Sequence, residues 1–267
     1  MELFKKSFSL LINNKQKVFT SVGVDFIFYI LVLLSGFYFF NKFSEKFEII
    51  NNNISSVVLA DEELSQGALL KLNAVSTALT DMLLIVIGYF ILVLILWGIF
   101  NGAVWLICKN IIKNKKPFDG FDITFLSRYY ILSLFWFLIT GILFFSFYNY
   151  NSYVLSLGNI GILIVNLPIL LILYFGTISF SLFFVNGKTI KSFTNCFKLG
   201  LSKVSFLIAF VLFILIFYFS EFILLSLGKL INSNVFSILG IIAFLLIMVW
   251  FRVYLLLLVE KYAGDRI

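Results

Sequence analysis

Histidine is absent from this chain of 267 residues, and cysteine, proline and charged residues are scarce. Without histidine the chain lacks the commonest general base, the commonest metal ligand and the usual pH switch. Its two cysteines, Cys108 and Cys196, form no CxxC pair, so the sequence indicates neither a disulfide framework nor a zinc site. Charged residues make up 12% of the chain, about half of their usual share in a soluble domain.

Enzyme signatures are missing as well. The sequence contains no P-loop, no HExxH motif, no GxSxG motif and no glycine-rich phosphate loop. The carboxylate run Asp61-Glu62-Glu63 has no second cluster at metal-ligand spacing and is typical of the start of a solvated helix. We therefore expect no catalytic residues, no cofactor and no metal site, and a protein that is not an enzyme.

Apolar residues dominate what is present: 62% of the chain is hydrophobic, and phenylalanine alone occurs 35 times. One water-soluble core cannot hide that much apolar surface, so lipid must solvate much of it. A segment that crosses a bilayer needs about 20 apolar residues. Six segments meet this condition, at about 18–40, 82–107, 130–148, 160–185, 204–227 and 236–259. The sequence predicts an all-α integral membrane protein with six transmembrane helices in a single polytopic domain, 1–267, whose first apolar run is retained as a span.

Lysine and arginine are distributed unevenly among the connections. The N-terminal tail has four, the 109–128 loop five and the 186–203 loop four, against three in 41–81, none in 149–159 and one in 228–235. Cytoplasmic loops carry the excess of positive charge, so both termini are expected in the cytoplasm of a multi-pass cell-membrane protein. This bias explains the net charge of +7 with anionic lipid headgroups as partner, and it leaves no need for nucleic acid.

Phenylalanine pairs four residues apart recur in the three cytoplasmic connections. They are Phe4 and Phe8, Phe121 and Phe125, and Phe193 and Phe197. Such pairs lie on one face of a helix, which suits amphipathic helices in the membrane interface with phenylalanine among the acyl chains. The alternative is chance, because phenylalanine is so common here. Together the pairs predict three repeats, each an interfacial helix followed by two spans, beginning near residues 3, 118 and 189.

The long outer connection, 41–81, predicts a helical hairpin. Apolar residues continue at helical spacing beyond the first span and resume before the second. The expected turn lies near Asn51–Asn53, and Asp61 is the expected N-cap of the returning helix.

Two stretches carry a family resemblance. "FKKSFSLLINNKQKVF" (4–19) and "VNGKTIKSFTNCFKLGLSKVSFLIAFVL" (185–212) resemble the six-span membrane domain that is fused to some glycerophosphoryl diester phosphodiesterases and has many uncharacterised relatives. The resemblance covers the whole chain in topology and these two stretches in residues. It implies an all-helical membrane module without the soluble phosphodiesterase domain, and it carries over no functional residue.

Three polar residues are expected at one depth within the spans near the cytoplasmic edge. Asp25 lies ~10 Å into the first span at ~1.5 Å per residue, and Arg252 and Asn101 fall at a similar level. Ionisable residues within a membrane are costly and ask for a partner. The alternatives are a structural tie of Asp25 and Arg252 with a hydrogen bond from Asn101, a functional ligand or gating site, and unrelated snorkelling side chains.

A second polar level is expected near the outer edge. Glu221 lies ~8 Å below that edge, and Asn166 and Pro168 reach a comparable depth. Pro168 removes a backbone hydrogen bond and is expected to kink its helix. Glu221 has no evident basic partner in the sequence. It would be protonated, face a water-filled crevice, or serve as a hydrogen-bonded structural acid.

Two classes of function fit these features. The first is a non-enzymatic integral membrane module that acts as a scaffold, an assembly factor or a lipid-contacting subunit with protein partners in a membrane complex. The alternative is the permease subunit of a transporter that works with a separate ATPase, although no coupling-loop motif is recognisable.

Overall fold

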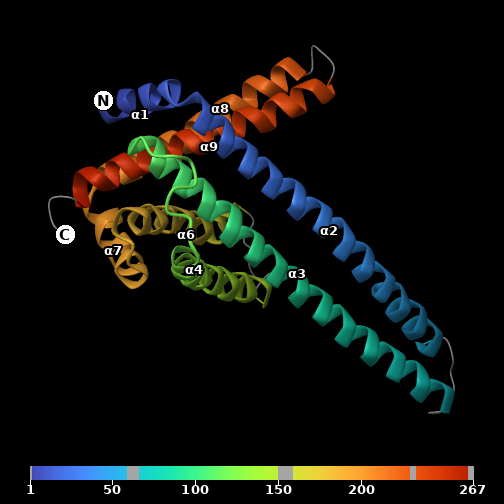
Figure 1. Cartoon of the computed structure of the whole chain (residues 1–267). Coiled ribbons are helices and arrows are strands. Elements are labelled where there is room, and N and C mark those ends of the chain that lie inside the picture. Colours follow the sequence, from blue (N-terminus) through green and yellow to red (C-terminus); the bar gives the residue numbers. More distant parts are fainter. Residues whose placement is uncertain (1, 59–65, 150–158, 229–232, 264–267) are drawn as a thin grey trace. The chain divides into compact units, whose positions relative to one another are not determined.

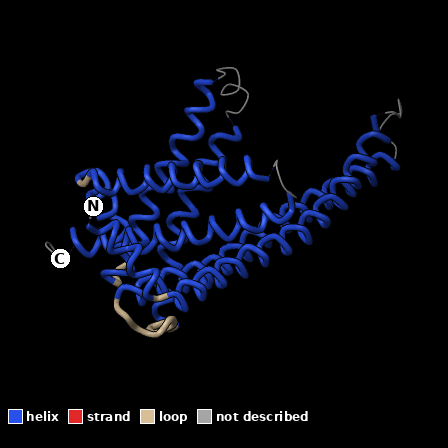
Figure 2. The backbone as a smooth tube through the Cα atoms, turned by 90° about the horizontal axis from the view of Figure 1, so that it is seen from above, coloured by secondary structure: helices blue, strands red, loops and turns tan. Residues whose placement is uncertain are grey.

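A computed structural model describes residues 2–58, 66–149, 159–228 and 233–263, and all regular structure in these ranges is α-helical (Figures 1 and 2). The helices are α1 (Glu2–Asn13), α2 (Lys15–Val58), α3 (Gln66–Ile112), α4 (Ile123–Asn149), α6 (Asn159–Asn186), α7 (Thr189–Ser202), α8 (Val204–Gly228) and α9 (Ser233–Ala263). The prediction of an all-α fold is confirmed.

Each predicted span lies within one of the long helices: α2, α3, α4, α6, α8 and α9. In the described ranges, five helices are long and apolar enough to cross a membrane, and there are six if the bent pair α7–α8 counts as one. The chain is therefore a multi-pass membrane protein. Helices α7 and α8 meet at an angle of 89° at Lys203, so α8 can cross a bilayer while α7 lies along its surface.

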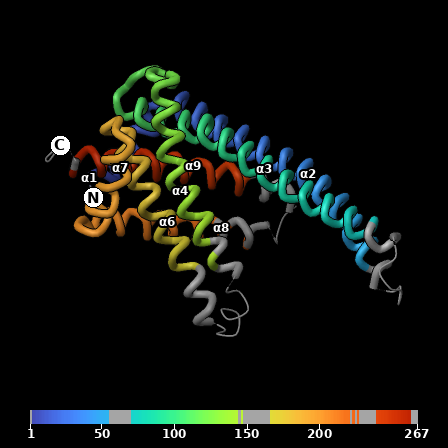
Figure 3. Tube along the Cα trace, turned by 90° about the horizontal axis from the view of Figure 1, so that it is seen from below, coloured from blue at the N-terminus to red at the C-terminus, as the bar shows by residue number. Residues whose placement is uncertain are grey.

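The chain divides into two compact units, Met1–Asp25 with Phe100–Ile267, and Phe26–Ile99. In the first unit, α9 packs against α1, α6 and α8. Consecutive residues of α9, from Leu255 to Val259, are all buried, which is the behaviour of a helix that is apolar around its whole circumference. Helix α7 packs on α4, α6 and α8, and its place beside α6 is visible in Figure 3.

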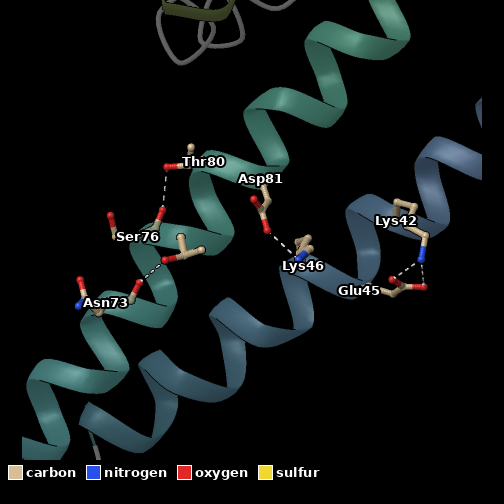
Figure 4. Close-up of polar contacts among 8 residues, drawn as sticks. Lys42, Glu45, Lys46, Asn73, Ser76, Thr80 and Asp81 are labelled. Carbon is tan, nitrogen blue, oxygen red and sulfur yellow. Dashed lines mark hydrogen bonds and ion pairs between the residues drawn. The ribbon is translucent and has the colours of Figure 1, made fainter.

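Residues Phe26–Ile99 form the second unit, an antiparallel pair made of the later part of α2 and the earlier part of α3. Phe39 packs on Tyr89 with 5.3 Å between ring centroids, and the ion pair Lys46–Asp81 joins the helices farther along (Figure 4). The two helices therefore pair as a hairpin, and the position of its outer part outside the membrane stays a prediction. The turn at Asn51–Asn53 is wrong, because α2 runs through these residues without a break. The N-cap predicted at Asp61 lies outside the described residues.

Two of the three predicted interfacial helices form as separate helices, α1 and α7. The second prediction is wrong for residues 118–122, which form turns and irregular backbone, so that α4 begins at Ile123. The Asp122 carboxylate accepts a hydrogen bond of 2.6 Å from the backbone N–H of Phe125, as an N-cap does. The loop therefore ends at this cap, whereas a continuous amphipathic helix from about residue 118 was expected from the sequence. The threefold repeat stays a prediction.

The phenylalanine pairs pack on protein more than expected. Phe4 lies 5.5 Å from the Trp250 ring, and Phe193 lies 5.5 Å from the Trp136 ring, centroid to centroid. Phe8 and Phe197 remain partly exposed. A phenylalanine face turned wholly toward acyl chains is therefore wrong for α1 and α7. In α1 and in α7, both phenylalanines of the pair contact one tryptophan of a neighbouring helix.

Candidate functional site

Asp25, Asn101 and Arg252 come together inside the first unit from α2, α3 and α9. Arg252 Nη1 lies 2.5 Å from Asp25 Oδ2, and Arg252 Nη2 lies 3.4 Å from Asp25 Oδ1. The same Nη2 donates a hydrogen bond of 3.3 Å to Asn101 Oδ1. The predicted contact between these three residues is confirmed. The two-point contact suits the planar guanidinium, which matches a carboxylate in a way that lysine does not.

The site is almost closed to its surroundings. The Asp25 and Arg252 side chains are 5% and 7% exposed, and Asn101 is buried. The guanidinium carbon lies 5.9 Å from the centre of the Trp105 ring, within the range of a cation–π contact. In a low-dielectric interior an unpaired charge is expensive, whereas this carboxylate and this guanidinium offset one another. The arrangement ties three helices together near one level.

The polar groups near Asp25 are engaged with one another. The carboxylate of Asp25 is bound to Arg252, and the Cys108 sulfur lies 4.0 Å from the Ser21 hydroxyl. Across residues 2–58, 66–149, 159–228 and 233–263, no group of three or more Asp, Glu or Cys side chains is placed to hold a metal ion. The contacts at this site support helix packing, and the expected absence of a metal site stays a prediction.

The structure describes the second predicted cluster only in part. Glu221 belongs to α8, but its side chain lies outside what the structure describes. Asn166 is exposed on α6, and Pro168 stands inside the same helix, which continues to Asn186. The grouping of these three residues and the kink at Pro168 stay predictions.

Asn110 is a polar residue whose role the sequence analysis missed. It is buried at the end of α3, and its side-chain Nδ2 donates hydrogen bonds of 3.0 Å to the carbonyls of Pro117 and Asp119. Asn114, which follows, has a φ of 51°, a left-handed conformation that asparagine tolerates better than most residues. Asn110 thus builds the turn between α3 and α4. The available sequence signal for this turn was the pair of asparagines, Asn110 and Asn114, among the lysines of this connection.

Helix α1 is fixed to α9 by a polar contact inside an aromatic cluster. Trp250 Nε1 donates a hydrogen bond of 3.0 Å to the buried Ser7 hydroxyl, while the Phe8 ring stacks on the Trp250 ring. The Tyr254 ring also stacks on Trp250, with 5.6 Å between the two ring centroids. The spacing of Phe4 and Phe8 pointed to this face, but sequence alone did not identify its partner.

Helix α7 is held against α6 by a close backbone approach. The Tyr174 hydroxyl donates a hydrogen bond of 2.8 Å to the carbonyl of Gly200, and a Cβ at Gly200 would lie 2.8 Å from Phe175. Only glycine fits this approach without displacing a ring. On the same helix, burial raises the pKa of the Cys196 thiol to about 12, so it stays protonated at neutral pH.

The outer side of α7 is both apolar and basic. Ile190 and Leu201 are 72% and 78% exposed, and Lys191 and Lys198 are exposed beside them. These residues recur at helical spacing on the side that faces away from α6. An apolar and basic face of this kind suits the boundary between acyl chains and anionic headgroups.

The fold and the buried ion pair define a multi-pass membrane protein with an internally neutralised polar site. Comparisons with protein-family models, with curated proteins and with solved structures give no match. The resemblance to the membrane domain of glycerophosphoryl diester phosphodiesterases therefore stays a prediction.

Proposed function

We propose that the protein is a non-enzymatic integral membrane module that serves as a lipid-contacting scaffold subunit in a membrane complex. The observation that carries the proposal is the closed contact of Asp25, Arg252 and Asn101. A site for transport or catalysis keeps polar groups available to a ligand. Here the intramembrane charges of Asp25 and Arg252 bind one another and, with Asn101, join α2, α3 and α9. These charges therefore serve to hold the helices together.

Anionic lipid headgroups on the cytoplasmic side are the proposed surface partner. The lysine excess in the N-terminal tail and in the 109–128 and 186–203 loops supports a cell-membrane location with both termini cytoplasmic. The exposed Lys191 and Lys198 of α7 add to this charge where the helix turns by 89° into α8. Each lysine near an anionic surface contributes roughly 1 kcal/mol to attraction.

Native mass spectrometry of the purified full chain tests the lipid partner. The Lys191→Gln/Lys198→Gln variant is expected to retain less phosphatidylglycerol than the wild type after extraction, because two headgroup contacts are lost. Lys42→Gln, on the second unit, is the matched control and should retain the wild-type amount. Equal retention in all three proteins would remove α7 from the lipid-contacting role.

Cross-linking in native membranes, followed by identification of the partners, tests the scaffold role. A scaffold subunit should be recovered with membrane proteins that lack ATPase activity of their own. Recovery of an ATPase as the main partner would instead favour the permease alternative. The topology is checked separately: cysteine at Asn52 should react with an impermeant reagent from outside, and cysteine at Asn114 only after permeabilisation.

A further inference from the structure

The hairpin of the second unit extends past the apolar spans. The uncharged part of α2 ends before Lys42, and that of α3 begins after Asp81. Lys46 Nζ lies 2.7 Å from Asp81 Oδ2, so both helices become charged at one level (Figure 4). Beyond this level α2 continues to Val58 and α3 reaches back to Gln66, which amounts to ~18 Å and ~22 Å of helix at ~1.5 Å per residue.

This outer part of the hairpin keeps the direction of the spans. Helices α2 and α3 are unbroken over Lys15–Val58 and Gln66–Ile112, and neither contains proline. Sharp kinks in helices occur almost only at proline, at a Gly/Ser pair, at a π-bulge or at an inserted group. The Ser35-Gly36 pair of α2 lies within the apolar span, and the helix continues through it. The outer part therefore projects from the membrane surface instead of lying on it, and lipid does not cover its sides.

One face of the hairpin is nevertheless apolar and exposed. Beyond the Lys46–Asp81 level, this side of α2 carries Phe47 and Ile54, which are 56% and 46% exposed. The same side of α3 carries Leu72 and Leu79, which are 48% and 54% exposed, while Ile49 and Leu70 are exposed on the opposite side. Residues seven apart lie two turns apart on the same side of a helix, as in a coiled coil. We call Phe47, Ile54, Leu72 and Leu79 the hairpin face.

The two stripes lie on the same side of the hairpin. Phe47 directly follows Lys46, which contacts α3, and Leu79 directly follows Ala78, which is 3% exposed. One residue is a rotation of ~100° about the helix axis. In an antiparallel pair of helices, the residue that follows a contact residue turns toward the same side of the pair on both helices. Phe47 and Leu79 therefore lie on one side of the hairpin. Glu45 directly precedes Lys46, so it is rotated the opposite way.

Charge is thus kept off the hairpin face. Glu45 binds Lys42 at 2.9 Å on the other side, as Figure 4 shows. The outer segments 41–58 and 66–81 carry the lysines Lys42, Lys46 and Lys71 and the acids Glu45, Glu48 and Asp81. The connection between them adds Asp61, Glu62 and Glu63, so 41–81 has a net charge of −3. The exposed apolar face, and not charge neutrality, favours association.

We propose that the hairpin face binds the hairpin face of a second copy of this chain, so that two hairpins form a four-helix bundle outside the membrane. Two copies with the same orientation in one membrane hold their faces at the same height. A twofold axis along the membrane normal then aligns the stripes without further adjustment. In this arrangement α2 of one copy lies opposite α3 of the other, as in antiparallel bundles.

The available area is sufficient for such a contact. Large apolar side chains expose up to ~200 Å² each, so the four residues of the hairpin face offer on the order of 400 Å². This is about half of the ~800 Å² per partner of a standard interface, and polar neighbours on both helices would supply the rest. The proposal depends on the spanning role of α2 and α3, and not on the lipid-contacting or non-enzymatic parts of the proposed function.

Site-directed cross-linking of the full chain in its own membrane tests the proposal. Two differently tagged copies are co-expressed, one with Phe47→Cys and one with Leu79→Cys, and treated with a short thiol cross-linker. The matched control pair is Glu48→Cys with Thr80→Cys, one residue farther around each helix. The native thiols, Cys108 and Cys196, are buried, and the wild type checks that they do not react.

We expect a dimer that carries both tags for the Phe47/Leu79 pair and several-fold less of it for the control pair. The Phe47→Glu/Leu79→Glu variant, counted by single-molecule photobleaching in nanodiscs, should fall from two copies to one, whereas Glu48→Gln should stay at two. A wild type that is already monomeric, or equal cross-linking of both pairs, would overturn the proposal. So would cross-links mainly to another protein, or reaction of the Phe47→Cys variant with a lipid-borne thiol probe.

Discussion

Removal of either partner of the buried ion pair is expected to destabilise the protein strongly. Asp25→Ala leaves Arg252 uncompensated at a site where both side chains are more than nine-tenths buried, and Arg252→Ala does the same to Asp25. The loss of one partner of a buried pair costs about 3–5 kcal/mol. Asn101→Ala removes only one hydrogen bond to a charged group, for which we expect about 1.5–3 kcal/mol.

The double variant distinguishes an interacting ion pair from two charges that act independently. Asp25→Ala/Arg252→Ala leaves no charge unmatched, so we expect it to recover about 2–3 kcal/mol relative to the sum of the single losses. The half-exposed pair Lys46–Asp81, only 2.7 Å long, is the matched control. Solvent screens its charges, and its coupling should stay below about 1 kcal/mol.

Unfolding of the full chain by increasing fractions of sodium dodecyl sulfate in mixed micelles measures these values. The charge exchange Asp25→Arg/Arg252→Asp should be more stable than either of its halves, because opposite charges again face one another. Strictly additive losses for Asp25 and Arg252 would show that the contact does not stabilise the fold. Wild-type stability with loss of a cellular phenotype would make the site functional, against the proposal made above.

Two further substitutions test local contacts. Gly200→Ala places a methyl group against Phe175, so overpacking should cost about 1–3 kcal/mol and loosen α7. Unfolding and proteolysis measure this effect. Leu201→Ala, on the exposed side of α7, should change little. Asp122→Ala removes the N-cap of α4 and should cost about 1 kcal/mol, whereas Asp119→Ala, whose ion pair with Lys115 is long and exposed, should be near neutral. Equal effects of each substitution and its control would contradict the assigned contact.

The sequence was sufficient to predict the helices, and it left the ion pair of Asp25 and Arg252 as one of three alternatives. Long apolar runs have few alternatives in a membrane, because every backbone polar group must be bonded within the segment. The constant rise of a helix then allowed the depths of Asp25, Asn101 and Arg252 to be compared by counting residues. Because a charged side chain within the membrane is energetically costly, Asp25 and Arg252 had a physical reason to pair.

Contacts between helices were less accessible to this reasoning. The spacing of apolar residues identifies the helix face on which Phe4 or Phe193 lies. It does not show whether that face contacts lipid or a tryptophan ring, because both are apolar. The turn predicted at Asn51–Asn53 was wrong because asparagine is also tolerated within a long helix whose other contacts favour continuation. The role of Asn110 depends on the carbonyls of Pro117 and Asp119, which lie in the turn beyond α3, where helical spacing no longer relates residues.

The ion pair joins the first membrane helix to the last, and this order matters during synthesis. Asp25 and Arg252 are separated by 227 positions along the chain. At ~5–20 residues per second, a ribosome needs roughly 10–45 s to travel between them. For that interval the nascent chain holds a carboxylate in the membrane without Arg252, and a chain truncated before α9 holds it permanently. Completion of the final helix is therefore also the step that neutralises the carboxylate of the first one.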